Sequence, residues 1–370
     1  MKKQLLAVFL ATSVLITSLT ACGEISDGKT GTEADHSKIG TEENDPGNTS
    51  EILDDTVNPI IQAYRKQLSR QIAGYEEGLT EAEAKKSEAR RSADGSDAYK
   101  EALYESVEIT EQKLEIYSSM LVEIDKLIEQ EQNYLLTEEN EQNNADGGEL
   151  LLSNDLLKAA EKFQDEILAD LSAVRTEYKA LLLEAKDSDS LYPGLMPANE
   201  QKKLAAKLTE LEIDAELVLC LAGFADQEPQ DGEKAPAAAV FGWPLTDYYY
   251  ISSHFGRRML DGSYEYHAAT DIAAGEGAPI CAAGSGTVVR SEWNDYYGYY
   301  VLIDHGNGRS TLYAHQSQPP FVVEGDKVAY GQEIGLVGNT GYSFGARLHF
   351  EFRIGGERVD AEQYMTPPHQ

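Results

Sequence analysis

Cysteine is scarce in this sequence, and positive charge is far outweighed by negative charge. The 370 residues include three cysteines, and 31 Lys and Arg stand against 64 Asp and Glu, which gives a formal net charge of −33. No two cysteines are spaced as C-x-x-C, and we expect Cys220 and Cys281 to be small buried residues rather than a disulfide or a metal pair. A chain this acidic is not expected to bind nucleic acid or anionic lipid through charge.

The acidic residues are concentrated in the first two thirds of the chain. Segment 241–370 carries 8 basic and 15 acidic residues, whereas the remainder carries 23 and 49. We interpret this excess as the solvated surface of a helical region. At this length the chain is too long for one ordinary domain, so two or more folded units are expected.

Residues 1–21 are typical of an export signal. Lys2 and Lys3 precede a short apolar run at 5–16, and the sequence Leu-Thr-Ala-Cys then ends at Cys22. This run is too short to be a convincing membrane-spanning helix. Leu-Thr-Ala-Cys resembles the bacterial lipobox, in which the cysteine becomes the lipidated first residue of the mature chain. We therefore expect lipidation of Cys22 and an extracytoplasmic, membrane-anchored protein, the alternative being an ordinary signal peptide with an incidental cysteine.

Residues 22–50 and 51–225 differ sharply in composition. The first segment has almost no apolar residues and is expected to be a disordered tether. The second has apolar residues at steps of three and four, as in amphipathic helices. One stretch repeats them every seven residues, as a coiled coil does, at Val107, Leu114, Leu121, Ile128 and Leu135.

Breaks in this periodicity divide the helical region into four helices. They fall at 93–96, 143–148 and 192–197, and Ser153-Asn154-Asp155 offers capping residues for the third helix. The helices could fold back as antiparallel hairpins or assemble between chains, and the pattern does not choose. Their expected use is as a spacer, a docking surface for a protein partner, or a cover over a C-terminal site.

The pattern changes after a linker at 226–240. From 241 to 365, short β-branched and aromatic runs alternate with Gly and Asp turns, which predicts an all-β, mostly antiparallel domain. The predicted fold class is therefore multidomain. An N-terminal all-α region of coiled coils or helical hairpins precedes a C-terminal all-β domain.

Three polar residues of the β domain have the chemistry of a zinc site. His267 and Asp271 are four positions apart, and His349 lies in the alternating segment 347–352. Alternation places the apolar side chains of this strand on one face and those of His349 and Arg347 on the other. Two nitrogens and one carboxylate oxygen would leave a fourth position for water, as in catalytic zinc sites. The alternative is that these residues fill turn and strand positions without a metal.

Eight segments of the β domain, in the same order, resemble the lysostaphin/LytM-type zinc endopeptidases. These bacterial enzymes cut peptide bonds in the cross-links or stem peptides of peptidoglycan. The matching segments include His267 to Ala274, Tyr313-Ala314-His315, 338–341 and Leu348-His349-Phe350-Glu351. The resemblance implies a LytM-like domain acting on peptidoglycan peptides.

The resemblance also implies the roles of individual residues. His267, Asp271 and His349 match the family's ligands for one Zn²⁺ ion, which would supply a bound hydroxide as the nucleophile and polarise the scissile carbonyl. His315 matches the family's histidine that hydrogen-bonds the attacking water or the oxyanion and moves a proton. The expected cofactor is therefore zinc, and the expected catalytic assistant is His315.

Arg347 is the important departure from the family pattern, because it stands where the family has the first histidine of H-x-H. Arginine cannot act as a base, and loss of a general base typically costs about 10²–10⁴-fold in rate. In one hypothesis the protein is a zinc endopeptidase in which His315 alone handles the proton and Arg347 is an electrostatic or substrate-positioning group. In the other, the domain is catalytically degenerate and acts as a wall-binding scaffold or as an activator of another wall hydrolase. The intact ligand set favours the first hypothesis.

Overall fold

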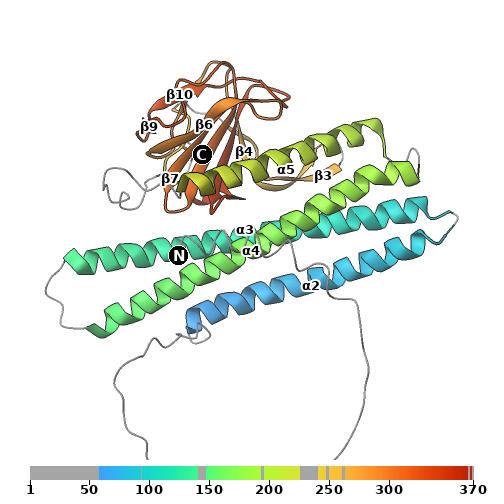
Figure 1. Ribbon diagram of the computed structural model, residues 1–370, viewed down its shortest axis with the longest axis horizontal. Coiled ribbons are helices and arrows are strands. Elements are labelled where there is room, and N and C mark those ends of the chain that lie inside the picture. Colours follow the sequence, from blue (N-terminus) through green and yellow to red (C-terminus); the bar gives the residue numbers. More distant parts are fainter. Residues whose placement is uncertain are drawn as a thin grey trace, which may run out of the picture. The chain divides into compact units, whose positions relative to one another are not determined.

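The computed structural model in Figure 1 describes most of the chain after residue 57. The described residues are 58–92, 94–140, 147–192, 196–225, 241–246, 250–260, 263–365 and 367–368. The predicted signal peptide, Cys22, the tether and the linker at 226–240 lie outside them. Residues 58–370 belong to one compact unit. Within the described part, none of the helices has the length and apolar character needed to span a membrane.

Four long helices come first among the described residues. They are α2 (Pro59–Ala89), α3 (Ser96–Asn140), α4 (Gly147–Leu191) and α5 (Ala198–Ala225). The Asn58 side chain accepts hydrogen bonds from the first backbone N–H groups of α2 and so caps it. Helix α4 begins at Gly147, so the prediction of caps at 153–155 is wrong. The intervening Glu and Leu residues are strong helix formers and continue the helix through these positions.

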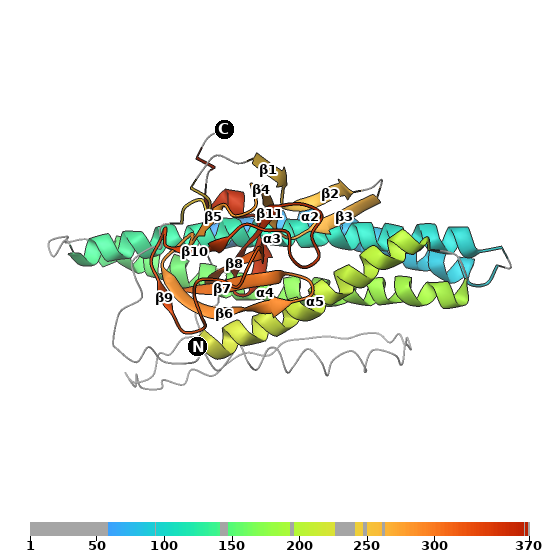
Figure 2. The same ribbon diagram turned by 90° about the horizontal axis from the view of Figure 1, so that it is seen from above.

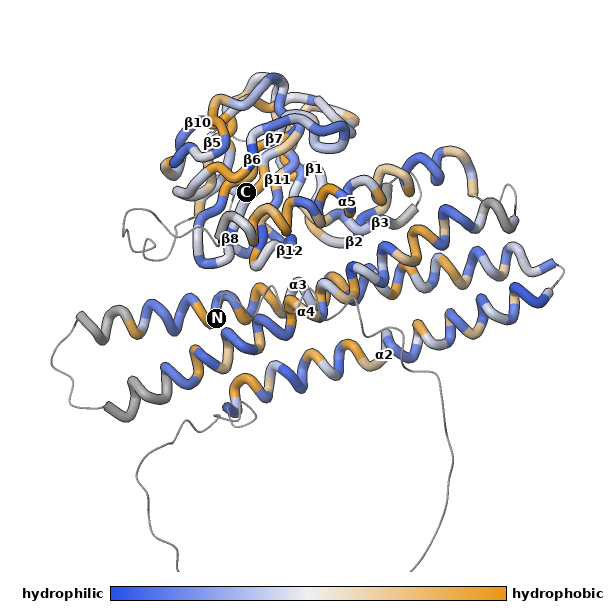
Figure 3. Tube along the Cα trace, viewed as in Figure 1, coloured by the Kyte–Doolittle hydropathy of each residue, from blue (hydrophilic) through white to orange (hydrophobic). Residues whose placement is uncertain are grey.

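The heptad pattern forms the core between the helices of one chain. Leu114, Leu121, Ile124 and Ile128 of α3 are all buried. Helix α3 packs along both α2 and α4, and Figures 1 and 2 show the three side by side. Figure 3 shows hydrophobic and hydrophilic positions interspersed along each of them, as expected for helices with one buried face. The helices therefore fold back on one another within the chain.

The residues after the helices form antiparallel sheets. The main sheet has the strand order β1 (Tyr250–Ser253), β4 (Thr270–Ala273), β11 (Arg347–Ile354), β8 (Arg309–Gln316), β7 (Gly298–Gly306), β6 (Gly286–Asn294) and β9 (Lys327–Val328), with β12 (Glu357–Val359) paired to β11. Two further pairs are β2 (Gly256–Leu260) with β3 (Ser263–His267), and β5 (Pro279–Cys281) with β10 (Glu333–Leu336). A short 3-10 helix, η3 (Ala361–Gln363), follows. The prediction of a helical region followed by an antiparallel β domain is confirmed.

Helices and strands are joined by buried polar contacts. Asp125 of α3 lies 2.7 Å from Arg309 of β8, measured from carboxylate Oδ2 to guanidinium Nη2, and both side chains are almost fully buried. The backbone of Tyr266, next to His267, is held by both α3 and α5. Its N–H donates to Glu111 of α3 at 3.2 Å, and its carbonyl accepts from Lys207 of α5 at 2.7 Å. The helices therefore hold the chain directly beside a predicted metal ligand.

The two cysteines of the described region are free. Cys281 is buried as predicted, but the prediction that Cys220 is buried is wrong, since this residue is only half-buried on α5.

Candidate metal centre

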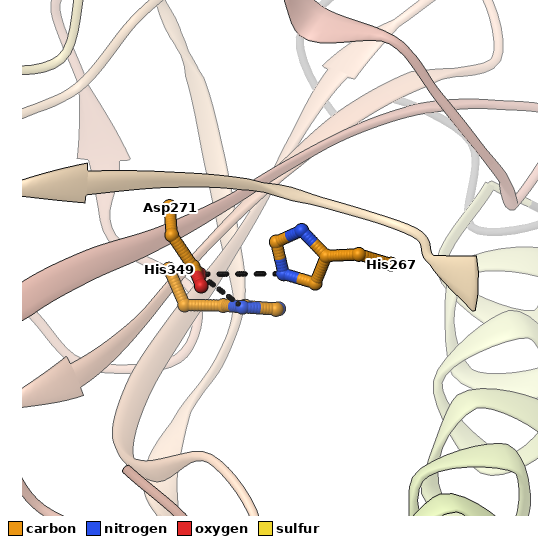
Figure 4. A group of neighbouring side chains, drawn as sticks. All are labelled: His267, Asp271 and His349. Atoms are coloured by element: carbon orange, nitrogen blue, oxygen red, sulfur yellow. Dashed lines mark hydrogen bonds and ion pairs between the residues drawn. The ribbon is translucent and has the colours of Figure 1, made fainter. Parts of the chain in front are cut away.

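The β-sheet brings His267, Asp271 and His349 together (Figure 4). His349 of β11 lies directly opposite Asp271 of β4 in the antiparallel register, so both side chains leave the same face of the sheet. His267 ends β3 and approaches from the side. One ligand atom from each residue lies within 4.8 Å of the others, and all three residues are buried. This donor set is two imidazoles and one carboxylate, which suits Zn²⁺.

Hydrogen bonds behind the two imidazoles fix which nitrogen of each ring faces the centre. Nδ1 of His267 lies 3.1 Å from the carbonyl oxygen of His254, and Nε2 of His349 lies 3.2 Å from Oε1 of Glu351. The other nitrogens, Nε2 of His267 and Nδ1 of His349, lie 3.4 and 3.0 Å from Oδ1 of Asp271. Metal-binding histidines typically donate their second N–H to a carbonyl or carboxylate in this way. The residues present therefore fit a zinc ion.

Two arginines neutralise the second oxygen of Asp271. Arg258 and Arg347 each place a guanidinium nitrogen 3.3 Å from Oδ2. Burial alone would raise the pKa of Asp271, but its contacts with His267 and His349 lower that pKa to well below the usual value. Asp271 is therefore a carboxylate, with Oδ1 turned toward the imidazoles and Oδ2 toward the arginines.

The pKa of His349 is raised above that of an ordinary histidine. Burial lowers its pKa, but hydrogen bonds to Asp271 and Glu351 outweigh burial and raise it. A metal ion needs the neutral ring, so binding at Nδ1 must displace this proton.

His315 lies beside the same centre, at the end of β8. Its ring centroid is 5.5 Å from that of His349, and its Nδ1 lies 2.9 Å from the carbonyl oxygen of Thr340. Burial, with the nearby His349 and Arg347, lowers the pKa of His315 to about 3. The ring is therefore neutral at neutral pH, with an N–H at Nδ1 and a lone pair at Nε2. Its backbone φ of 61° is uncommon for a residue other than glycine.

Arg347 lies between Asp271 and His315. Its Nη2 is 3.5 Å from Nε2 of His315, while its Nε faces Asp271. The guanidinium thus contacts both a predicted ligand and the predicted proton carrier. All five residues predicted for the metal centre and its chemistry are brought together by the fold, and their individual roles stay predictions.

Some residues of the centre were missed in the sequence. The alternation of β11 places Glu351 on the same face as His349, and this pattern is the signal for its role. Arg258 carries no comparable local signal. His254 contributes its backbone carbonyl and not its ring, because its imidazole is mostly exposed and pairs with Glu362 at 2.7 Å.

Comparison with known proteins matches this part of the chain to a family of peptidases. Residues 265–361 match the model of Peptidase family M23, so the C-terminal β region is an M23, LytM-type domain. Peptidoglycan DD-endopeptidase ShyC of Vibrio cholerae is 42% identical over 140 residues, which cover 37% of this chain and 32% of the relative. ShyA, a second peptidoglycan DD-endopeptidase of that organism, is 39% identical over 128 residues, covering 34% and 30%.

A third relative is named for a different function. Murein hydrolase activator EnvC of Escherichia coli is 35% identical over 134 residues, which cover 36% of this chain and 30% of the relative. In all three comparisons the match spans about a third of each protein. The residues that match the family model, 265–361, begin after α5, the last of the four helices described.

Proposed function

We propose that this protein is a zinc endopeptidase that cleaves peptide bonds in the cross-links or stem peptides of peptidoglycan. The observation that carries the proposal is the convergence of His267, Asp271 and His349 within 4.8 Å, with the outward nitrogen of each imidazole already hydrogen-bonded. The names of the relatives ShyC and ShyA support peptidoglycan as the substrate. Zinc is the expected metal for this donor set.

The side chains around the centre divide the chemical work. Zn²⁺ held by the three ligands would polarise the scissile carbonyl and lower the pKa of a water molecule toward about 7. His315 would accept a proton at Nε2, because Nδ1 is committed to the Thr340 carbonyl; this Nε2 also faces Nη2 of Arg347 at 3.5 Å. Arg347 supplies a fixed positive charge beside the ligands, suited to a developing oxyanion or a substrate carboxylate. It takes no part in proton transfer.

Digestion of isolated peptidoglycan tests this proposal. The chain without its predicted signal peptide is loaded with zinc, and newly released muropeptides and amine termini are identified by mass. We expect products from the wild type, and none above background from His349→Ala, which removes a ligand. Equal product from both proteins would show that the centre is not responsible for cleavage.

A second candidate function follows from the contacts of Arg347. Its guanidinium engages both Asp271 and His315. Because an arginine stands at this position, the centre has no second neutral imidazole to serve as a base. The relative EnvC is named as an activator of murein hydrolases. The domain would then bind wall peptide as a scaffold, or activate a separate wall hydrolase through a protein partner on its helices. Zinc binding without cleavage by the wild type, together with cleavage by Arg347→His, would select this candidate.

We further propose that the protein is a lipoprotein of the cell envelope. Residues 1–21 would be the signal peptide, Cys22 the lipidated residue, 22–50 a tether, 51–225 the helical region, 226–240 a linker and 241–365 the peptidase domain. Acyl chains on Cys22 would provide membrane attachment. In a bacterial host, Cys22→Ala should move the protein from the membrane fraction to the soluble fraction and abolish incorporation of labelled fatty acid. An unchanged distribution would contradict lipidation at this residue.

A further inference from the structure

A row of buried charges connects helix α5 to the metal centre. Asp214 of α5 is fully buried, with Oδ1 2.7 Å from Nη1 of Arg353 on β11. Arg353 is also fully buried and donates from Nε to Oε2 of Glu351 at 2.9 Å. The other oxygen of Glu351 faces Nε2 of His349 at 3.2 Å. Three contacts therefore lead from a helix of the N-terminal region to a predicted zinc ligand.

The geometry of β11 explains why this row exists. Residues 349, 351 and 353 alternate along the strand, so their side chains leave the same face of the sheet. Each of them is buried. A buried ion needs a partner of opposite charge, because its desolvation costs several kcal/mol. Helix α5 meets this need for Arg353 by bringing in the carboxylate of Asp214.

The surrounding charges are balanced in the same way. The helices contribute Arg175, Lys207 and Glu210 besides Asp214, and β12 contributes Glu357 and Arg358. The closest contacts in this group are Arg175 with Asp214 and Glu357, Arg358 with Glu210, and Lys207 with Glu210. Arg358 also lies 3.6 Å from both Asp214 and Glu351. Asp214 approaches Arg175 at 3.0 Å and Arg353 at 2.7 Å as an ion pair rather than through aligned hydrogen bonds. Its role in the group is therefore chiefly that of a fixed negative charge.

This charge acts on Glu351 through Arg353. Arg353 is drawn toward Asp214 on one side and bonded to Glu351 on the other, so its guanidinium is fixed between two carboxylates. Glu351 in turn accepts a hydrogen bond from Tyr297 at 2.7 Å and faces His349. Without the charge of Asp214, Arg353 keeps its bonds to Glu351 and to the carbonyl oxygen of Gly356 at 3.3 Å, but it loses its second carboxylate partner. The carboxylate that orients the His349 ring is then less constrained.

We propose that Asp214 is a positioning residue for the metal ligand His349, acting through Arg353 and Glu351. The helical region is then part of the metal centre and not only a spacer beside it. The inference rests on the metal-binding part of the proposed function and is independent of peptide cleavage. Partners behind a metal-binding histidine typically contribute about 10–100-fold to metal affinity.

The test compares zinc affinity in two matched variants of the chain without its predicted signal peptide. Asp214→Asn keeps the shape of the side chain and removes its charge. Asp125→Asn is the control, because Asp125 is also a buried helical aspartate paired with a buried arginine of the β domain, at 2.7 Å. The other partners of Asp125 are Gln164 and Tyr364, which are not residues of the metal centre.

Zinc Kd is measured by competition with a chromogenic chelator, and the visible absorption of the Co²⁺-substituted protein reports ligand geometry. We expect about 10-fold weaker zinc binding and an altered Co²⁺ spectrum in Asp214→Asn. This is the lower end of the range for such partners, because Asp214 acts through two intervening residues. Asp125→Asn should lower thermal stability but leave both metal readouts at wild-type values. Should Asp214→Asn fail to fold, Arg353→Lys carries the test. It keeps the positive charge, loses the planar fork between the two carboxylates, and should also weaken zinc binding.

The outcomes separate this inference from the proposed function. Wild-type zinc affinity and Co²⁺ spectrum in Asp214→Asn, or in Arg353→Lys when that variant carries the test, would overturn the positioning role while leaving the zinc site intact. Equal weakening in Asp214→Asn and Asp125→Asn would also overturn it, because the effect would then be one of general stability. A wild-type protein that binds no zinc would remove the proposed function itself, and this inference with it.

Discussion

Arg347 lies where it influences both the predicted ligands and the predicted proton carrier. Its guanidinium is 3.3 Å from Asp271 and 3.5 Å from His315. A permanent cation in this position repels a second cation and offers no lone pair for a proton. The neutral His315 is then left as the proton acceptor of the centre. A substitution of Arg347 is therefore the most informative single change.

We expect Arg347→His to raise the rate of muropeptide release by about 10²–10⁴-fold, the usual contribution of a general base. The measurement is the initial rate of product release from isolated peptidoglycan at saturating zinc. Arg347→Lys is the control, because it keeps a positive charge at the same position and should not raise the rate. A rate in Arg347→His equal to or below that of the wild type would show that arginine serves this centre better than a base does.

His305 predicts a pH dependence of stability that is separate from the metal centre. Its Nδ1 lies 2.9 Å from the carbonyl oxygen of Ser285 and its Nε2 lies 2.7 Å from Thr311, and burial lowers its pKa to about 4. The unfolded chain has the ordinary histidine pKa of about 6.5, so between these values the unfolded state binds a proton that the folded state does not. The contribution to stability is therefore present above about pH 6.5 and is lost as pH falls toward 4.

The expected loss of unfolding free energy from His305 over this interval is about 2–3 kcal/mol. It is measured by denaturant unfolding at a series of pH values in wild type and His305→Gln. Other histidines titrate as well, so the difference between the two proteins isolates the contribution of His305. Parallel pH profiles would contradict the assignment.

At the scale of elements, strand β11 shows what alternation in the sequence can and cannot predict. Leu348, Phe350 and Phe352 were predicted to share one face, and all three are fully buried. The opposite face was predicted to carry His349, which it does. That face is nevertheless buried too, because its charged side chains meet partners from the helices. Alternation reveals which residues share a face but not what covers it.

The existence of the helices was easier to predict from the sequence than the residues at which they begin. The heptad pattern identified part of the buried face of α3, because burial within a helix repeats with the helical period. Leu114, Leu121 and Ile128 are buried, whereas Val107 and Leu135 are only half-buried, and other buried residues of α3 lie outside the heptad series. The start of α4 was misplaced, since Ser, Asn and Asp are tolerated inside a helix as well as at its cap. Whether the helices pack within one chain or between chains depends on how well the side chains of loop-connected helices fit together. The periodicity of the sequence does not predict this fit.

Packing along α3 leads to a direct prediction of stability. Leu121 is fully buried in the core shared by the helices. Leu121→Ala should lower the unfolding free energy by about 2–5 kcal/mol through lost burial and a residual cavity. Leu219→Ala on α5 is the control, because Leu219 is 61% exposed and its truncation should change stability by about 0.5 kcal/mol or less. Similar effects of the two substitutions in denaturant unfolding would contradict the packing described.

At the scale of the whole molecule, the contacts between helices and strands could not be read from the sequence. The acidic excess was interpreted as solvated surface, which is wrong for Asp125, Glu210 and Asp214, all of which are buried. Asp125 and Arg309 are 184 residues apart, so no local spacing links them. The sequence around a carboxylate with a distant partner does not differ from the sequence around a carboxylate that faces water. The motifs of the metal centre could be recognised in the sequence because their residues occur in a characteristic order within short segments.

These buried contacts predict that the helical region and the β domain unfold together. Both tryptophans, Trp243 and Trp293, lie in the β domain, so their fluorescence reports its unfolding, while far-UV circular dichroism is dominated by the helices. We expect coincident transitions for the two probes in the wild type. In the double variant Asp125→Asn/Asp214→Asn, which weakens the interface, the transitions should separate. Separate transitions already in the wild type would show that the two regions are energetically independent.

The most direct test of the account is X-ray absorption at the zinc edge of the metal-loaded protein. We predict one zinc per chain, with nitrogen and oxygen ligands at about 2.0–2.2 Å, two of them imidazoles, and no sulfur. His349→Ala should lose the signature of one imidazole. Zinc absent at stoichiometric loading, a sulfur ligand, or an unchanged spectrum in His349→Ala would contradict a metal centre built from His267, Asp271 and His349.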